Sequence, residues 1–217
     1  MTHFYTDLLQ ATQKERYELQ HIEALQKGAI GEISLSTYQE FLTQAYHHVK
    51  HTIPLLMACG SRISHRQEWV RDAIAEYIEE ELGHQEWILN DLRETGVDPE
   101  TVRHGKPSLA TELMVAYAYD CIHRNNPLSF FGMVLVLEGT SIALATSAAE
   151  KIKVKLELPD SAFSYLTSHG ALDIEHMGFY ESLMNKVTNE NDQQAIVHAA
   201  KVFYKLYGDI FRAIPLN

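Results

Sequence analysis

Apolar residues recur at alternating steps of three and four along almost the whole chain, with polar residues between them. This is the period of an amphipathic helix, and no convincing strand pattern of strict alternation is found. Glycine, proline and asparagine separate the periodic segments. The pattern predicts an all-α bundle of seven helices, at about residues 4–27, 36–59, 66–94, 108–124, 128–153, 160–187 and 192–213.

Several helix ends carry recognisable signals. Ser36, with Gln39 three residues later, has the spacing of a capping box, and Ser108 precedes the fourth predicted helix. Pro127 stands at the expected first position of the fifth helix. That helix is apolar nearly all round from Phe130 to Leu137, so we expect it at the centre of the bundle.

Three predicted helices carry polar residues at positions that should be apolar. In the sixth, His169, Asp173 and His176 follow at i, i+4 and i+7 within an otherwise apolar seam. In the third, Glu81 and His84 interrupt the seam at i, i+3, and Glu138 follows the apolar run of the fifth. These residues form the candidate site: Glu81, His84, Glu138, His169, Asp173 and His176.

Burying such groups costs several kcal/mol unless something satisfies them. For His169, Asp173 and His176 alone, a bound metal ion and a buried hydrogen-bond network explain the pattern equally well. Adding Glu81, His84 and Glu138 gives three carboxylates and three imidazoles without sulfur, which suits iron, or manganese, better than copper(I) or structural zinc. Helix bundles house dinuclear iron sites with such inward Glu-x-x-His pairs. Glu80, at the edge of the same face, is the alternative to Glu81.

The composition of the chain limits the classes of function that it can have. With 217 residues, 46% hydrophobic and 22% charged, the chain suits one domain covering residues 1–217. The net charge of -11 argues against nucleic acid or an anionic membrane as partner, and the longest apolar run is too short for a membrane span. Two cysteines, Cys59 and Cys121, are too few for a disulfide scaffold, so we expect a cytoplasmic protein. A bundle of this kind often pairs with itself, and a homodimer is expected.

The candidate residues carry a family resemblance. An early Glu and His, a lone Glu, and His-x-x-x-Asp-x-x-His about thirty residues later resemble the heme-oxygenase-like diiron oxidases, iron-containing redox enzymes of the TenA- and PqqC-like superfamily. The resemblance covers essentially the whole chain, and the motif of the sixth helix is its specific part. It implies a seven-helix heme-oxygenase-like bundle and two non-heme iron ions. The implied activity is that of an oxidase or oxygenase that activates O2 on a small carboxylate or amino-acid-like substrate.

We expect the substrate pocket between the second, third and fifth predicted helices. Its expected lining consists of residues that flank the polar seams: His48, Thr52, Tyr77, Phe131, Leu135 and Tyr180. Ordinary core packing is the simpler interpretation of the two tyrosines.

Two other interpretations stay open at this point. The first is a TenA-like hydrolase or binding protein for thiamin-related pyrimidines, which needs no iron. Such an enzyme keeps a nucleophilic cysteine on the central helix, whereas Cys59 and Cys121 lie on other predicted helices. The second is a non-catalytic bundle in which the six residues form a polar network or hold one structural metal ion.

Overall fold

The computed structural model describes residues 3–216, apart from the side chains of residues 143, 144, 146 and 169–175. This part of the chain is helical throughout and contains no strand. Its α-helices are α1 (Phe4–Ala11), α2 (Gln13–Gln20), α3 (Glu23–Ile30), α4 (Leu35–Val49), α5 (Thr52–Arg62), α6 (Glu68–Glu81), α7 (His84–Glu94), α8 (Pro99–Arg103), α9 (Leu109–Arg124), α10 (Phe130–Leu156), α11 (Ser164–Met184) and α12 (Glu190–Ala213). The all-α prediction is therefore confirmed.

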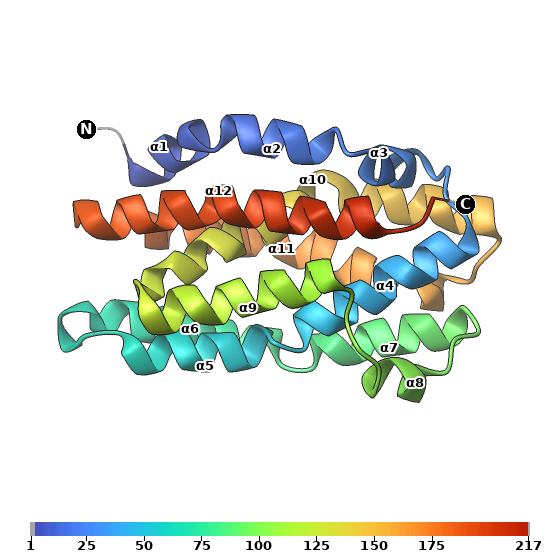
Figure 1. Cartoon of the computed structure of the whole chain (residues 1–217), viewed down its shortest axis with the longest axis horizontal. Coiled ribbons are helices and arrows are strands. Elements are labelled where there is room, and N and C mark those ends of the chain that lie inside the picture. Colours follow the sequence, from blue (N-terminus) through green and yellow to red (C-terminus); the bar gives the residue numbers. More distant parts are fainter. Residues whose placement is uncertain (1–2, 217) are drawn as a thin grey trace.

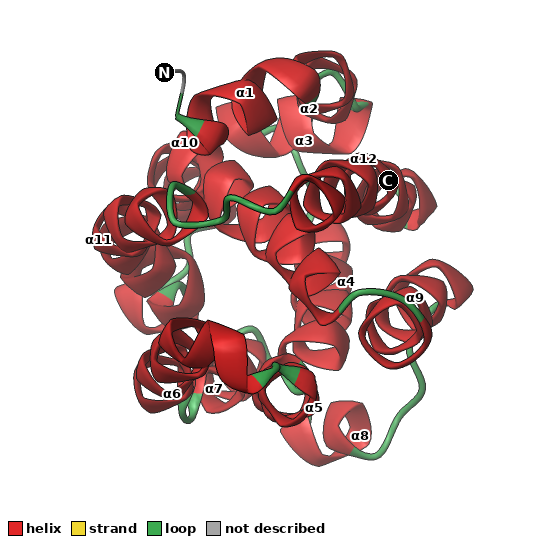
Figure 2. Cartoon of the chain, turned by 90° about the vertical axis from the view of Figure 1, so that its left-hand side faces the viewer, coloured by secondary structure: helices red, strands yellow, loops and turns green. Residues whose placement is uncertain are grey.

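The helices pack around α10. The most extensive contacts of α10 are with α11 and α12, as expected for the most apolar helix of the chain. Figure 1 shows α12 along the long axis, with α1 to α3 on one side of it and α4 and α9 on the other. Seen from the end, α10 and α11 form one side of the bundle, and α5, α6 and α7 lie below them (Figure 2).

The fourth, fifth and seventh predicted helices agree closely with α9, α10 and α12. Ser108 caps α9 as expected, with its hydroxyl accepting from the backbone N–H of Thr111 at 3.3 Å. Pro127 opens a 3₁₀ turn, Pro127–Ser129, directly before α10. The short α8 lies between the third and fourth predicted helices, where the sequence predicts no helix.

The first two predicted helices are divided in the structure. Residues 4–27 were expected to form one helix, but α1, α2 and α3 are separated at Thr12 and Ile22, and the Thr12 hydroxyl donates to the carbonyl of Leu8 at 2.8 Å. The second predicted helix breaks between α4 and α5. Pro54 explains that break, since a proline is tolerated in the first turn of a helix but not in its interior. The cap of α4 is Ser34, not Ser36: its side chain accepts from Thr37 N–H at 3.1 Å.

A glycine allows α10 and α12 to approach closely. A Cβ atom on Gly132 of α10 would lie 2.5 Å from the backbone nitrogen of Ala200 and 2.9 Å from the carbonyl oxygen of Ile196, both on α12. Backbone atoms of a packed helix cannot move aside as a side chain can. The close contact between α10 and α12 at the centre of the bundle therefore requires glycine at position 132.

Asp91 fixes the start of α11 from a neighbouring helix. It lies on α7, is fully buried, and accepts hydrogen bonds from the backbone N–H groups of Ser164 at 3.0 Å and Tyr165 at 2.9 Å. The Ser164 hydroxyl donates to the same carboxylate. The first N–H groups of a helix have no partner within it, and a carboxylate there also interacts favourably with the helix dipole.

We expect Asp91→Ala to lower the free energy of unfolding by about 2–4 kcal/mol, because it leaves buried N–H donors without an acceptor. Urea unfolding monitored by circular dichroism would measure the loss. Glu94→Ala is the control, since Glu94 lies near the end of the same helix and its exposed side chain accepts a hydrogen bond from Ser161. Equal effects of the two variants would contradict the capping role of Asp91.

Among the described residues, no single helix is both long and apolar enough to cross a membrane; only the segments Pro127–Ile142 and Ser147–Leu156 taken together, bent against each other, meet that criterion by length and composition.

Candidate metal centre

Glu81 and His84 meet at a break between two helices. The sequence predicted one continuous helix over residues 66–94, but α6 ends at Glu81 and α7 begins at His84. Gly83 causes the break, because its φ of 90° lies in the left-handed region that favours glycine. Both side chains are buried, and His84 Nδ1 lies 2.9 Å from Glu81 Oε2. The break, and not a helical turn, brings this pair together.

His176 of α11 joins this pair to the central helix. Its Nε2 atom lies 3.1 Å from Glu80 Oε2, and its Nδ1 atom lies 4.0 Å from Glu81 Oε1 and 3.9 Å from Glu138 Oε1. The imidazole is 4% exposed and so is shielded from water on nearly every side. Side chains from α6, α7, α10 and α11 thus form one cluster, which we call the acidic histidine cluster: Glu80, Glu81, His84, Glu138 and His176.

Glu80 and Glu81 both reach His176. Glu80 is closer to it but its side chain is 41% exposed, whereas that of Glu81 is 10% exposed and also contacts His84. The choice of Glu81 over Glu80 as a ligand stays a prediction, and the structure keeps both within reach of the cluster.

Two predicted ligands, His169 and Asp173, lie outside the described residues. They precede His176 on α11, whose bounds include them. Among the side chains that are described, no group of three or more His, Cys, Asp or Glu residues is arranged to hold a metal ion. Of the six predicted ligands, Glu81, His84, Glu138 and His176 belong to the acidic histidine cluster, together with Glu80.

The donors of the cluster suit a hard or borderline divalent metal. They are carboxylate oxygens and imidazole nitrogens, with no thiolate among them, which is the set expected for iron or manganese. Glu81 lies within ion-pair distance of His84 and His176, and Glu138 lies within that distance of His176. Histidine ligates metals through a neutral imidazole nitrogen. A bound cation would offset the charge of buried carboxylates, whose burial is costly without such compensation. The residues present fit bound iron on these grounds.

A cavity lies directly beside the cluster. It encloses about 730 Å³, including space open to solvent, and Glu81 and Glu138 form part of its wall. The predicted substrate residues His48, Thr52 and Tyr77 also line it. The remaining lining comes mainly from α4, α5 and α10: Val49, Leu55, Leu56, Phe130, Met133, Val134, Leu137 and Ser141, with Tyr165 and Tyr207 from α11 and α12.

Three predicted substrate residues do not line this cavity. Phe131 and Leu135 are 1% exposed within the hydrophobic core and do not contribute to the cavity wall. The Tyr180 hydroxyl donates to the carbonyl oxygen of Phe131 at 2.8 Å, so its hydrogen bond is already made inside the core. The sequence missed Ser141, Tyr165 and Tyr207. Of these, Ser141 could have been found, because it stands at i+3 from Glu138 and so lies on the same helix face.

Tyr77 brings a hydroxyl group to the cavity wall. The residue is 2% exposed, and no described residue gives its hydroxyl a hydrogen-bond partner. Its ring meets that of His176 edge to face, with centroids 6.1 Å apart. Burial, followed by the charge of Glu138, raises the pKa of Tyr77 well above its usual value, so the hydroxyl is a neutral donor.

Neither cysteine is part of the site. Cys59 and Cys121 are buried, and burial raises the pKa of each thiol to about 12. Their sulfur atoms contact the carbonyl oxygens of Pro127 and Ala118, and neither residue lines the cavity. A buried thiol of raised pKa is a poor nucleophile.

Comparison with protein families identifies the chain. Residues 39–208 match the family described as "iron-containing redox enzyme". The chain belongs to this family. The matched range includes the whole acidic histidine cluster, as well as His169 and Asp173. No curated protein matches the chain.

Solved structures show the same fold. A domain of unknown function from Shewanella denitrificans is 21% identical, with 97% of this chain and 91% of that chain covered and a TM-score of 0.87. A TenA homologue from P. horikoshii is 9% identical over 97% of each chain, with a TM-score of 0.79. Heme oxygenase-1 from the cyanobacterium Synechocystis, in complex with heme, is 12% identical over 97% of this chain and 91% of that chain, with a TM-score of 0.77. The predicted heme-oxygenase-like fold is confirmed, whereas fold alone does not decide between the activities of these proteins.

Proposed function

We propose that this member of the iron-containing redox enzymes is a non-heme dinuclear iron oxidase or oxygenase. It would use O2 to oxidise a small carboxylate or amino-acid-like substrate held in the cavity beside the cluster. One observation carries the proposal: His176 lies 3.1–4.0 Å from Glu80, Glu81 and Glu138, and two of these carboxylates, Glu81 and Glu138, line that cavity. Such a site in a helix bundle is typical of dinuclear carboxylate proteins.

The residues that would hold iron come from four helices. Glu81, His84, Glu138 and His176 are the described candidates, with Glu80 as the alternative to Glu81, and α11 would add His169 and Asp173. Manganese fits the same donors. Iron, when bound, supplies the redox chemistry by which O2 is reduced and the substrate oxidised. As in other cofactor enzymes, the protein contributes binding, orientation and electrostatics.

The protein side chains have distinct roles in this proposal. Glu81 and Glu138 supply negative charge that offsets the charge of the metal. Tyr77 offers a hydrogen bond to an oxygen atom of a molecule in the cavity, because its hydroxyl has no partner among the described residues. Leu55, Leu56 and Met133 form an apolar wall that limits the entry of water. Excluding water protects reactive species and strengthens the electrostatic interactions within the site.

The TenA-like alternative gains no support from the thiols. A hydrolase that relies on a cysteine nucleophile needs an activated thiol at the cavity, and Cys59 and Cys121 are buried elsewhere with raised pKa. We further propose a cytoplasmic homodimer that consists of one domain per chain and binds neither nucleic acid nor membranes, in line with the charge of -11.

Metal analysis tests the proposal. After anaerobic loading with ferrous iron and removal of excess metal, we expect about two iron ions per chain. Exposure to O2 should then give absorption bands of the oxidised protein that the unloaded protein lacks. A content near zero after loading would refute the assignment, and one tightly held ion without any O2-dependent change would favour a structural metal site.

A further inference from the structure

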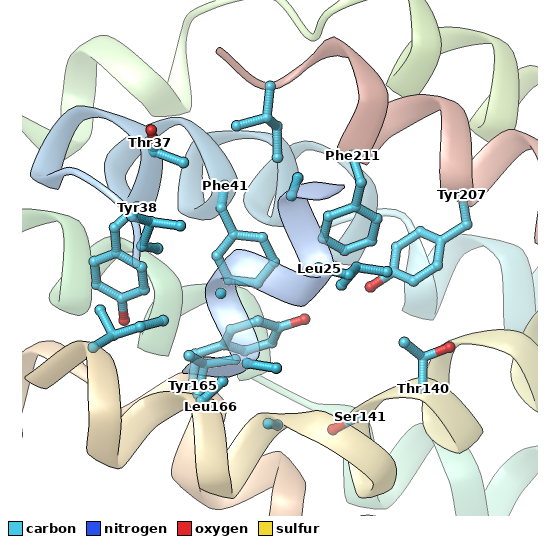
Figure 3. Close-up of a pocket in the computed structure, with 18 residues that line it drawn as sticks. Leu25, Thr37, Tyr38, Phe41, Thr140, Ser141, Tyr165, Leu166, Tyr207 and Phe211 are labelled. Carbon is cyan, nitrogen blue, oxygen red and sulfur yellow. The ribbon is translucent and has the colours of Figure 1, made fainter. Parts of the chain in front are cut away.

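A second cavity lies next to the first. It encloses about 740 Å³, including space open to solvent, between α3, α4, α10, α11 and α12. Aromatic, aliphatic and small residues form most of its wall, as Figure 3 shows for Phe41, Leu166 and Phe211. None of the residues of the acidic histidine cluster lines it. A cavity of this size and apolar character is suited to part of a small molecule.

The two cavities meet at three residues. Ser141, Tyr165 and Tyr207 line both of them. Figure 3 shows the hydroxyl groups of Tyr165 and Tyr207 pointing toward the interior from opposite sides, with Ser141 on α10 below them. Tyr207 also contacts the ring of His48, with centroids 5.9 Å apart, and His48 belongs to the cavity beside the cluster. A molecule that passed these three residues would occupy both spaces.

Two hydroxyl groups without a hydrogen-bond partner among the described residues line the cavity beside the cluster. The hydroxyls of Tyr77 and Ser141 are buried and have no hydrogen-bond partner among the described residues. Buried hydroxyl groups are rarely left unpaired in folded proteins, so a ligand atom that pairs with them is favoured. The far cavity also has hydroxyl groups in its wall, but those of Thr37, Tyr38 and Thr140 already donate to backbone carbonyl oxygens.

We propose that the two cavities are compartments of one site, which takes a substrate with an oxygen-bearing polar end and an extended apolar segment. The polar end binds beside Tyr77 and the acidic histidine cluster. The apolar segment passes Ser141, Tyr165 and Tyr207 and fills the far compartment. This inference rests on the proposed function for the reaction at the polar end, and it narrows the substrate to an amphipathic molecule.

A substitution at Gly28 can test whether the apolar segment of the substrate reaches the far compartment. It lies in α3, on the wall of the far compartment, and a Cβ atom added there meets no atom within 4 Å. A leucine at this position would extend into the compartment without displacing the backbone. Gln26→Leu is the matched control, because Gln26 lies on the exposed face of the same helix and is not part of the wall.

The test uses calorimetry to measure the affinity of the iron-free protein for straight-chain primary alcohols of about four to ten carbons. The affinity of the unaltered protein should rise about fourfold per added methylene until the far compartment is full. Gly28→Leu should weaken the longest alcohols tenfold or more and leave the shortest within about twofold. Tyr77→Phe should weaken all lengths by a similar factor of about threefold to tenfold.

Several results would overturn the inference: affinity that does not depend on length, a Gly28→Leu effect equal at all lengths, or the same effect from Gln26→Leu. If Gly28→Leu fails to fold, Ala148→Leu on α10, another residue that lines the far compartment, takes its place. Iron content, measured separately, keeps the two proposals apart. If alcohol binding depends on chain length but the protein binds no iron after loading, the double compartment is supported and the oxidase proposal is refuted. If the protein binds two irons but alcohol binding does not depend on chain length, the oxidase proposal is supported and the double compartment is refuted.

Discussion

His176→Ala is expected to reduce the iron content from about two ions per chain to near zero. His176 lies between Glu80, Glu81 and Glu138, so it is the described residue that connects α11 to the carboxylates of α6 and α10. The substitution removes one imidazole donor, and it also removes the side chain that lies between the carboxylates of α6 and α10. Mutation of a ligand in a pre-formed site usually costs far more affinity than mutation of a supporting residue.

Thermal unfolding gives a second measurement of this prediction. A ligand that binds only the folded state at about one hundred times its Kd adds about 2.7 kcal/mol to the free energy of unfolding. For a chain of this size, iron loading should therefore raise the Tm of the unaltered protein by roughly 5–10 °C. His176→Ala should show no such rise, and His176→Gln, which fills more of the space, should behave in the same way.

The control for His176→Ala is His198→Ala, since His198 is an exposed histidine of α12. This variant should bind iron as the unaltered protein does. If His176→Ala folded and retained both irons, the assignment of the cluster as a metal centre would be wrong. If it lost stability equally with and without iron, a buried polar network would be the better explanation.

Gly132→Val should destabilise the bundle by more than about 3 kcal/mol. The clash is with backbone atoms, at 2.5 Å from the nitrogen of Ala200 and 2.9 Å from the oxygen of Ile196, so relief requires α10 and α12 to separate. Since domains are stable by only about 5–15 kcal/mol in total, a large part of the margin would be lost. Urea unfolding at constant temperature would measure the change.

Gly178→Ala is the matched control for Gly132→Val. Gly178 lies in the interior of α11 and is exposed, and a Cβ atom added to it meets no atom within 4 Å. Alanine there should raise the free energy of unfolding by about 0.5–1 kcal/mol, as expected for a helix interior. A Gly132→Val protein within 1 kcal/mol of the unaltered one would show that the contact between α10 and α12 can relax.

Hydrophobic periodicity predicted the helical class and the central place of α10 because both depend on which residues avoid water. It failed at the helix breaks. Pro54 and Gly83 each interrupt a segment whose periodicity continues across the break, so the pattern alone cannot distinguish a break from a continuous helix. Thr12 ends α1 by a side-chain hydrogen bond that leaves no trace in the apolar pattern.

The candidate site was partly predictable for the same reason. Glu138 and His176 stand out because they are polar residues at buried positions, and the structure places them 3.9 Å apart. Spacing alone left Glu80 and Glu81 unresolved, since both glutamates are close to the cavity side of α6. Phe131 and Leu135 do not line the cavity beside the cluster. Because α10 is apolar on nearly every face, periodicity does not indicate which of its residues do.

The hydrogen bonds of Asp91 have a mechanical consequence for the cluster. They tie the first turn of α11 to α7, and α7 begins with His84, so the two helices that carry the donor histidines are joined by these hydrogen bonds. Glu80 and Glu81 belong to α6, on the other side of Leu82 and Gly83. The position of His84 relative to these glutamates is therefore set by the left-handed backbone of Gly83 on one side and by the tie between α7 and α11 on the other.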